Sequence, residues 1–234
     1  VMDFFEGKDL DCLVLINPDN PTGNYISRKG MLKLARWTKE KNIRFLADES
    51  FVDFSEEAEP TLLVEELLDE NPHMIVVKSI SKSYGIPGLR LGVAASGDTD
   101  LIGQLKKDVA IWNINSFGEF YMQIEEKYRK DYNSALDKLR GERTRFAEKL
   151  SNLPGVCVFP SQANYLMVEL TDKSISATEI TELLLTRYNL FIKDLSSKIS
   201  RNGRQFLRIA IRNEAEDNIL VKALKEILAQ CSKQ

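Results

Sequence analysis

Residues 76–92 read VVKSISKSYGIPGLRLG, and this stretch decides the fold. An apolar strand leads into a loop of serine, glycine and proline that contains Lys82, and Arg90 follows eight residues later. A lysine in such a place suits a Schiff base with an aldehyde cofactor, because desolvation and a nearby positive charge activate its amine. Ser79, Ser81 and Arg90 supply donors for a phosphate group. For any single lysine, a surface position in a loop is the more common explanation, so the assignment depends on other motifs.

A second motif follows another apolar strand. Residues 13–23 read LVLINPDNPTG, a strand that runs into a turn rich in proline. Asn17 and Asn20 each precede a proline, which keeps them out of the helical region and lets an amide point out of the turn as a fixed donor. An ordinary strand-to-helix turn explains the same residues.

The third motif places a carboxylate at a strand end. Residues 43–54 read IRFLADESFVDF, and the apolar run stops at Asp48. The carboxyl end of a parallel strand is where open α/β sheets bind ligands. Against a pyridine nitrogen, this carboxylate would keep the nitrogen protonated and make the ring an electron sink. A helix or turn cap is an equally good explanation of Asp48 taken alone.

Together these motifs resemble those of the fold-type I pyridoxal phosphate enzymes, specifically the class I/II aminotransferases. The closest resemblance is to the branch that holds histidinol-phosphate aminotransferase and threonine-phosphate decarboxylase. The family patterns are Asn-Pro-x-Asn-Pro-Thr-Gly at 17–23, Asp-Glu-x-aromatic at 48–51, Ser-x-Ser-Lys at 79–82 and Pro-Gly-Leu-Arg-Leu-Gly at 87–92. The resemblance implies pyridoxal 5′-phosphate as cofactor and no metal. It further implies that Lys82 forms the Schiff base, Asp48 pairs with the ring nitrogen, Asn20 donates to the ring hydroxyl, and Ser79, Ser81 and Arg90 hold the phosphate.

One position departs from the pattern. Many relatives carry tyrosine where this chain has Phe51, and that tyrosine also reaches the ring oxygen of the cofactor. Without this hydroxyl, Asn20 becomes the main neutral donor to that oxygen. Phenylalanine is frequent here in sequences that resemble threonine-phosphate decarboxylase, so Phe51 stays a candidate cofactor contact.

Candidate substrate residues lie further along the chain. Residues 204–213 alternate apolar and polar side chains, the pattern of a half-buried strand, so Arg208 and Arg212 are expected on the face opposite the core. By resemblance, Arg208 grips the substrate carboxylate as a bidentate fork. Arg212 would add a second anion site, although a solvated strand end is the slightly favoured alternative. Asn164 resembles the family's asparagine near the substrate, with a turn residue as the alternative.

Composition excludes several other classes. The net charge of −3 and the lack of any Lys/Arg block argue against a nucleic-acid partner. Three widely spaced cysteines give neither a disulfide framework nor a metal site, and indicate reduced thiols in a cytoplasmic protein. One histidine, His73, is too few for a histidine triad or a zinc cluster. No apolar run reaches membrane-spanning length, and no secretory signal is visible.

The alternation of strands and amphipathic helices predicts an α/β fold. We expect a three-layer, mostly parallel sheet at 1–118 as a partial cofactor-binding domain, one long helix at 119–151, and a smaller α+β domain at 152–234. Strands are predicted near 12–17, 44–48, 74–79, 90–95, 156–160, 165–170, 190–194 and 206–212. Helices are predicted near 27–41, 61–69, 98–108, 117–151, 177–188 and 214–231. Ser27, Thr61, Ser176 and Asn213 are the predicted helix N-caps.

The resemblance covers nearly all of this chain, but the chain covers only part of the family. It begins at Val1, so the family's N-terminal arm, a helix start that binds phosphate and a ring-stacking aromatic are expected to be missing. A truncation, a proteolytic product or a segment of a fusion would explain this. Residues 111–117 and 192–198 look like aminotransferase domains fused behind a nucleotidyltransferase domain. We expect an open sheet edge, a weakly held cofactor, and Lys82, Asp48 and Asn20 together at the strand ends.

Three functions are weighed. The first is transfer of an amino group between an amino acid and a 2-oxo acid, with Lys82 moving a proton between Cα and the C4′ carbon of the cofactor, in an enzyme that is a homodimer when intact. The second is decarboxylation of a phosphorylated amino acid, which gains weight from Phe51 and Arg212. The third is an inactive fragment that serves as a folded or interacting domain.

Overall fold

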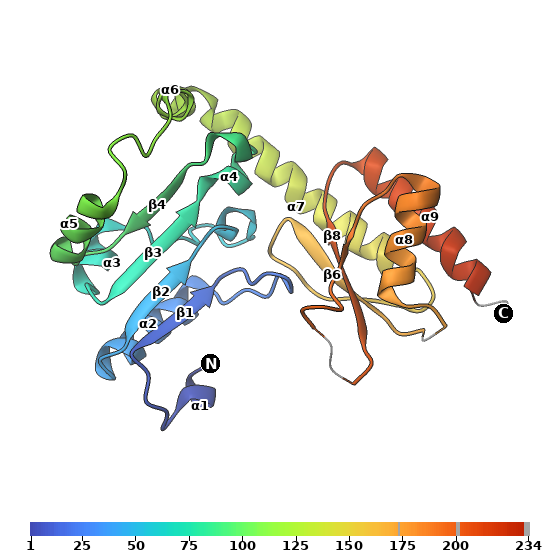
Figure 1. Cartoon of the computed structure of the whole chain (residues 1–234), viewed down its shortest axis with the longest axis horizontal. Helices are drawn as coiled ribbons and strands as arrows, with labels where there is room; N and C mark the ends of the chain where they lie inside the picture. The colour runs from blue at the N-terminus through green and yellow to red at the C-terminus, as the bar shows by residue number, and fades with distance from the viewer. Residues whose placement is uncertain (173, 200–201, 232–234) are drawn as a thin grey trace. The chain divides into compact units, whose positions relative to one another are not determined.

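The computed structural model describes residues 1–172, 174–199 and 202–231 (Figure 1). It contains two compact units. The first comprises Val1–Asp19 and Tyr25–Leu136, and the second comprises Asn20–Asn24 and Asp137–Gln234. The chain thus passes from one unit to the next inside a long helix, and the short loop 20–24 belongs with the later residues. These boundaries differ from the expected division at 118 and 151, which stays a prediction about independently folding parts.

The first unit is built on a mostly parallel sheet. Its strands are β1 (Cys12–Ile16), β2 (Arg44–Asp48), β3 (Met74–Ser79) and β4 (Gly92–Ala95), in the order β1-β2-β3-β4. The first three are parallel, and β4 runs antiparallel to β3. The predicted mixed α/β class is therefore confirmed, and β1 and β4 are the edge strands within the described residues.

One face of this sheet carries the core of the unit. The main covering helix is α2 (Arg28–Glu40), whose N-cap Ser27 accepts from the backbone N of Gly30 as predicted. Apolar side chains recur on one side of α2 and fit against alternate strand residues, which all point the same way. The buried cluster consists of Leu13, Met31, Leu34, Ala35, Ile43, Phe45, Ala47, Leu62, Met74 and Val76.

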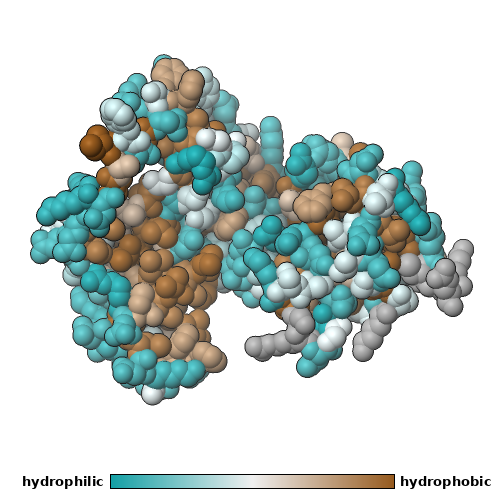
Figure 2. All heavy atoms as spheres, viewed as in Figure 1, coloured by the Kyte–Doolittle hydropathy of each residue, from teal (hydrophilic) through white to brown (hydrophobic). Residues whose placement is uncertain are grey.

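The other face of the sheet is more open. Val14 is 60% exposed and Ile16 is 39% exposed, while Leu46, Ile75 and Val77 on the same face are half-buried. Figure 2 shows hydrophobic side chains gathered over β1 to β3 on the side turned toward the viewer. Patches of this kind on a soluble protein commonly mark a surface that another element or molecule covers.

The other helices of the first unit that precede residue 110 are short. They are α1 (Met2–Phe5), α3 (Glu65–Glu70), α4 (Ile80–Ser83), α5 (Thr99–Asp108) and the 3₁₀ turns η1 (Val52–Phe54) and η2 (Pro87–Leu89). The prediction of a helix from 61 capped by Thr61 is wrong. Val64 occupies the N-cap position. The Thr61 hydroxyl donates to Oε2 of the buried Glu49 at 2.6 Å and accepts from the backbone N of Leu63 at 3.1 Å, so it closes a turn before the helix.

The long helix predicted at 117–151 is also interrupted. It consists of α6 (Ser116–Ile124), the 3₁₀ turn η3 (Glu125–Tyr128) and α7 (Arg129–Ser151). A 3₁₀ turn bonds residues three apart instead of four and so rotates the following helix. No proline or glycine marks this change between 119 and 140, which is why the sequence pattern gave no sign of it.

The second unit is an antiparallel sheet covered by helices. Its strands are β5 (Val156–Val158), β6 (Tyr165–Leu170), β7 (Lys193–Asp194) and β8 (Gln205–Ala210), in the order β5-β6-β8-β7. The helices α8 (Ala177–Tyr188) and α9 (Glu214–Cys231) and the end of α7 supply the other half of its core. The predicted capping box of Ser176 and Glu179 is present. Among the fully buried residues of this core are Phe146, Leu150, Leu166, Ile180, Leu184, Leu207 and Ile209.

Candidate active site

Asp48 and Lys82 lie at the same edge of the first sheet. Asp48 is the last residue of β2 and is paired with Val77 of the parallel strand β3. β3 ends at Ser79, and Lys82 follows in the single helical turn α4. Because β2 and β3 run in the same direction, both residues come from the carboxyl-terminal edge, where open α/β sheets bind ligands. Asn20 belongs to the second unit, and its predicted convergence with this pair stays a prediction.

The Asp48 loop is anchored by the next residue. Oδ1 of Asp48 accepts from the backbone N of Ser50 at 2.8 Å. Glu49 is 1% exposed and accepts from the Thr61 hydroxyl at 2.6 Å and from the backbone N of Leu62 at 2.7 Å. Burial raises the pKa of Glu49, and these two hydrogen bonds act in the opposite direction. Sequence reasoning missed this anchor, although a second carboxylate after an apolar strand was a sign of it.

Backbone contacts fix the Asp48 loop against the Lys82 segment. The N–H of Glu49 donates to the carbonyl of Val77 at 2.8 Å, and the N–H of Ser79 donates to the Ser50 hydroxyl at 3.0 Å. Phe51 is 9% exposed, and its ring lies 6.5 Å from that of Phe54. Phe51 therefore contributes apolar packing behind the loop, and its contact with a cofactor stays a prediction.

Lys78 and Lys82, four residues apart, differ in whether another side chain binds their amines. Lys78 donates to Oδ1 of Asp53 at 2.6 Å, and 12% of its side chain is exposed. Since side chains alternate along a strand, Lys78 leaves β3 on the face opposite Val77 and Asp48. Lys82 is exposed, and within the described part of the chain no hydrogen bond or ion pair engages its Nζ. Lys82 is therefore the lysine available for chemistry at this edge.

The predicted phosphate donors differ in availability. The Ser81 hydroxyl is buried and donates to the carbonyl of Leu91 at 3.4 Å, so it is already engaged by the backbone. Arg90 is exposed, and one of its five N–H donors reaches the carbonyl of Pro87 at 3.1 Å. Its backbone is left-handed, with φ 57° and ψ 46°. Ser79 and Arg90 thus fit a phosphate site better than Ser81, whose role stays a prediction.

In the second unit, Arg208 and Asn20 contact each other. Nη1 of Arg208 on β8 donates to Oδ1 of Asn20 at 2.7 Å, a contact across 188 residues of sequence. The guanidinium also lies 5.3 Å from the centre of the Tyr165 ring. Asn17, by contrast, turns inward: its amide exchanges two hydrogen bonds of 2.8 Å with the backbone of Ile26. Asn17 closes the loop, and among the residues that the structure describes no hydrogen bond engages the Asn20 amide nitrogen.

Arg212 lies outside the strand that carries Arg208, so the prediction of a strand to residue 212 is wrong, whereas the predicted core face of Leu207, Ile209 and Ile211 is buried. β8 ends at Ala210, and Arg212 lies beyond it with 67% of its side chain exposed, paired with Glu216. The solvated alternative describes it better. Asn164 precedes β6 directly, and its carbonyl accepts from the N–H of Ile211 at 3.0 Å. A substrate role for Asn164 or Arg212 stays a prediction.

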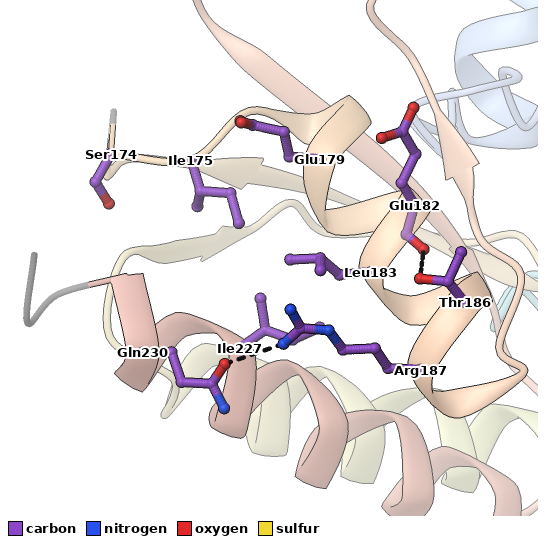
Figure 3. A pocket seen from close by; sticks show the side chains of 9 residues that line it. All are labelled: Ser174, Ile175, Glu179, Glu182, Leu183, Thr186, Arg187, Ile227 and Gln230. Carbon is purple, nitrogen blue, oxygen red and sulfur yellow. Dashed lines mark hydrogen bonds between the residues drawn. The ribbon is translucent and has the colours of Figure 1, made fainter.

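A cavity of about 430 Å³ lies between α8 and α9 (Figure 3). Its wall contains apolar Ile175, Leu183 and Ile227. Two of its polar side chains are already bonded: Arg187 donates to Gln230 at 3.3 Å, and Thr186 donates to the carbonyl of Glu182 at 2.7 Å. None of the predicted site residues lines this cavity.

The residues at the sheet edge fit pyridoxal phosphate. They combine an unengaged amine, a carboxylate with one oxygen bonded to the backbone, a serine hydroxyl and an exposed guanidinium. These are the groups that a carbonyl, a protonated pyridine and a phosphate require. In the described residues, no group of three or more His, Cys, Asp or Glu side chains is arranged to hold a metal ion.

Comparison with known proteins decides the family. Residues 5–224 match the family model described as Aminotransferase class I and II. The chain belongs to this family. Class I and II aminotransferases depend on pyridoxal 5′-phosphate, so the expected family and cofactor are confirmed at this level.

Several relatives of this class I and II aminotransferase chain carry names that describe other reactions. The L-serine phosphate decarboxylase of Sulfurospirillum multivorans is 37% identical over 232 residues, which are 96% of this chain and 57% of the relative. CMP-5′-(3-aminopropyl)phosphonate synthase of Streptomyces rubellomurinus is 34% identical over 225 residues, 96% of this chain and 35% of the relative. Threonine-phosphate decarboxylase of Salmonella typhimurium is 32% identical over 220 residues, which are 94% of this chain and 58% of the relative.

Solved structures agree with this assignment. A decarboxylase from Sulfurospirillum multivorans has a TM-score of 0.86 at 37% identity, over 97% of this chain and 64% of that one. The chain therefore spans between about a third and two thirds of the length of the proteins it resembles. Histidinol-phosphate aminotransferases are also among the relatives, so both activities of the expected branch are represented.

Proposed function

We propose that this sequence forms the catalytic centre of a pyridoxal phosphate-dependent decarboxylase that acts on a phosphorylated amino acid. The observation that carries the proposal is the 37% identity, over 96% of the chain, to a protein named L-serine phosphate decarboxylase. The identity to threonine-phosphate decarboxylase supports the same substrate class. Amino-group transfer was the first expectation from the sequence, and the relatives favour the alternative.

The residues at the sheet edge have separate tasks in this reaction. The cofactor, when bound, supplies an aldehyde for the substrate amine and a ring that withdraws electrons from the bonds at Cα. Asp48 would keep the ring nitrogen protonated through its negative charge. Ser79 and Arg90 would hold the phosphate. The bond from Cα to the carboxylate breaks, carbon dioxide leaves, and Nζ of Lys82 delivers a proton to Cα.

The role proposed for Arg208 depends on which anionic group of the substrate it would bind. A bidentate grip on the substrate carboxylate would hold negative charge on that group and oppose its loss as neutral carbon dioxide. A grip on the substrate phosphate would leave the carboxylate free to depart. Arg208 has donors besides the one given to Asn20, enough for a single anion. We therefore assign the phosphate of the substrate, and not its carboxylate, to Arg208.

The test uses the full gene product supplied with pyridoxal phosphate. O-phospho-L-serine, O-phospho-L-threonine and unphosphorylated L-serine are offered in turn, and carbon dioxide and the amine product are measured. We expect carbon dioxide to be released from the phosphorylated substrates and not from L-serine, and Lys82→Ala should abolish this release. Exchange of amino groups with 2-oxoglutarate, without carbon dioxide, would overturn the proposal. After borohydride reduction, peptide mapping should find the pyridoxyl group on Lys82, and a group on Lys78 would contradict the assignment.

A homodimer is also part of the proposal. Large apolar side chains are exposed in the connection from α5 to α6 and at the start of α6, with Ile111 94%, Trp112 92% and Phe117 79% exposed. Contiguous exposed apolar residues commonly mark a protein interface. Cytoplasmic location stays a prediction; Cys12 and Cys157 are free thiols, and no helix in the described ranges has the length and apolar character to cross a bilayer.

A further inference from the structure

Asp53 and Tyr132 hold the segment that carries Lys82 at both of its ends. Before Lys82, Lys78 donates to Oδ1 of Asp53 at 2.6 Å. The other oxygen of the same carboxylate, Oδ2, accepts from the Tyr132 hydroxyl at 2.8 Å. After Lys82, the ring of Tyr84 stacks on the ring of Tyr132, with centres 4.3 Å apart and planes at 13°.

These contacts form a closed ring around the segment 78–84. Lys78 is the next-to-last residue of β3, and Tyr84 is the C-cap of α4. Asp53 lies in η1, behind the Asp48 loop, and Tyr132 lies in the first turn of α7. All of them belong to the first unit. Two elements distant in sequence thus fix the start and the end of a short segment whose middle carries the exposed amine.

The charged side chains in this closed set of contacts have little exposure to water. The side chains of Lys78 and Asp53 are 12% and 16% exposed, so solvent competes little for their charges. Burial raises the pKa of Tyr132, and the negative charge of Asp53 raises it further, so its hydroxyl stays a donor through the pH range of ordinary measurements. Burial likewise raises the pKa of Tyr84 to about 12. The contacts are therefore expected to persist over the working range of an enzyme.

We propose that Asp53 and Tyr132 are positioning residues for Lys82. Asp53 binds the amine of Lys78, and Tyr132 stacks on Tyr84. Together these contacts fix the 78–84 segment and leave the Lys82 amine free at the carboxyl-terminal edge of the sheet. The proposal rests on the assignment of Lys82 in the proposed function. Neither Asp53 nor Tyr132 is required to touch the cofactor.

Three variants test the clamp formed by Lys78, Asp53, Tyr132 and Tyr84. Tyr132→Phe removes one hydroxyl and keeps the stacked ring, Asp53→Asn removes the charge at constant size, and Asp53→Glu restores the charge. Tyr25→Phe is the matched control, because the Tyr25 hydroxyl also donates to a carboxylate in the same unit, Oε2 of Glu57 at 2.5 Å, outside the 78–84 segment. Circular dichroism establishes that each variant is folded.

Two measurements are made on each protein. The first is hydrogen exchange of peptides covering 78–85 without cofactor, where Tyr132→Phe and Asp53→Asn should speed exchange about fivefold, the effect of losing one hydrogen bond. The second is the rate and place of pyridoxyl labelling under borohydride. Both variants should label Lys82 more slowly and spread label to other lysines, Asp53→Glu should recover part of the loss, and Tyr25→Phe should match the parent.

Unchanged exchange and labelling in Tyr132→Phe and Asp53→Asn would overturn the clamp. If Asp53→Asn does not fold, Tyr132→Phe decides alone, since it deletes a single oxygen atom. The two proposals also fail separately. A parent protein without label on Lys82 refutes the proposed function, whereas hydrogen exchange still judges whether the segment is held.

Discussion

Arg90 holds a backbone conformation that side chains other than glycine rarely adopt. Its φ of 57° and ψ of 46° lie in the left-handed region, where the Cβ atom crowds the following carbonyl and costs about 1 kcal/mol. Glycine would avoid this penalty, and Gly88 stands only two residues before. The presence of arginine is consistent with a task for its guanidinium, and the phosphate is our candidate for that task.

Arg90→Gly should therefore separate stability from cofactor binding. We expect the free energy of unfolding in urea to rise by about 0.5 kcal/mol, since relief of the crowding exceeds the added freedom of the unfolded chain. Retention of pyridoxal phosphate in equilibrium dialysis should fall at the same time. Asn42→Gly relieves a similar φ of 56° outside the site and should leave cofactor retention unchanged. If Arg90→Gly were less stable than its parent and retained pyridoxal phosphate equally tightly, this account would be contradicted.

Short motifs were enough to predict that Asp48 and Lys82 lie at the ends of neighbouring strands, because this placement depends on a few neighbours in sequence. The partners of Arg208 and Asp53 were not predictable in the same way. Asn20 is 188 residues from Arg208, and Tyr132 is 79 residues from Asp53. No local pattern contains such pairs, because tertiary packing alone brings them together.

The start of α9 and the middle of α7 share a buried pair of carboxyl groups. Asp217 is 2% exposed in the first turn of α9 and hydrogen-bonds with Glu142 of α7. Burial, helped by that neighbour, raises the pKa of Asp217 to about 7, while Arg145 and the backbone N of Arg212 act in the opposite direction. The hydrogen bond to Arg145 lowers the pKa of Glu142. A hydrogen bond between two carboxyl groups needs a proton on one of them, and the raised pKa assigns that proton to Asp217.

This pair makes the stability of the second unit depend on pH. A raised pKa means that the folded state binds more protons than the unfolded chain between about pH 4 and 7, so stability falls as pH rises through that window. Asp217→Asn keeps a donor for Glu142 and should lose less stability from pH 5 to 8, by about 3 kcal/mol, because the range from pH 5 to the raised pKa spans two units worth about 1.4 kcal/mol each. Glu142 contributes in the opposite sense, below its ordinary pKa.

Urea denaturation at several pH values provides the measurement. Asp137→Asn is the control, since Asp137 lies on the same helix with 74% of its side chain exposed. The control should keep the parent slope. Equal slopes for Asp217→Asn and the parent would show that the buried proton does not govern stability.

Elements were predictable where side chains complete their own helix ends. Ser27 and Ser176 begin α2 and α8 as expected, because each cap bonds to a residue three positions on. Thr61 has the same chemistry, but its hydroxyl donates to Glu49 and accepts from the backbone N of Leu63 two positions on, and the helix begins at Glu65 instead. Local capping rules do not include a distant carboxylate, so they do not predict which turn such a hydroxyl closes.

At the scale of the whole molecule, self-association should depend on the apolar connection before α6. Trp112→Glu should shift the protein toward the monomer, because an aromatic residue buries a large area when it is covered in an interface. Sedimentation velocity at several concentrations gives the measurement. Leu185→Glu alters a 48% exposed residue on α8 and should leave the association unchanged. A parent protein that is monomeric throughout would refute the dimer.

The edge strand β1 has a consequence for work with this polypeptide in solution. Its five residues, CLVLI, contain no charge and no proline, the features by which natural sheet edges discourage pairing with other chains. Val14 and Ile16 are also exposed on the face beside that edge. The strand is thus a template on which another molecule is able to add. Sulfate strengthens apolar burial, so the polypeptide should form sheet-rich aggregates in ammonium sulfate sooner than in dilute chloride.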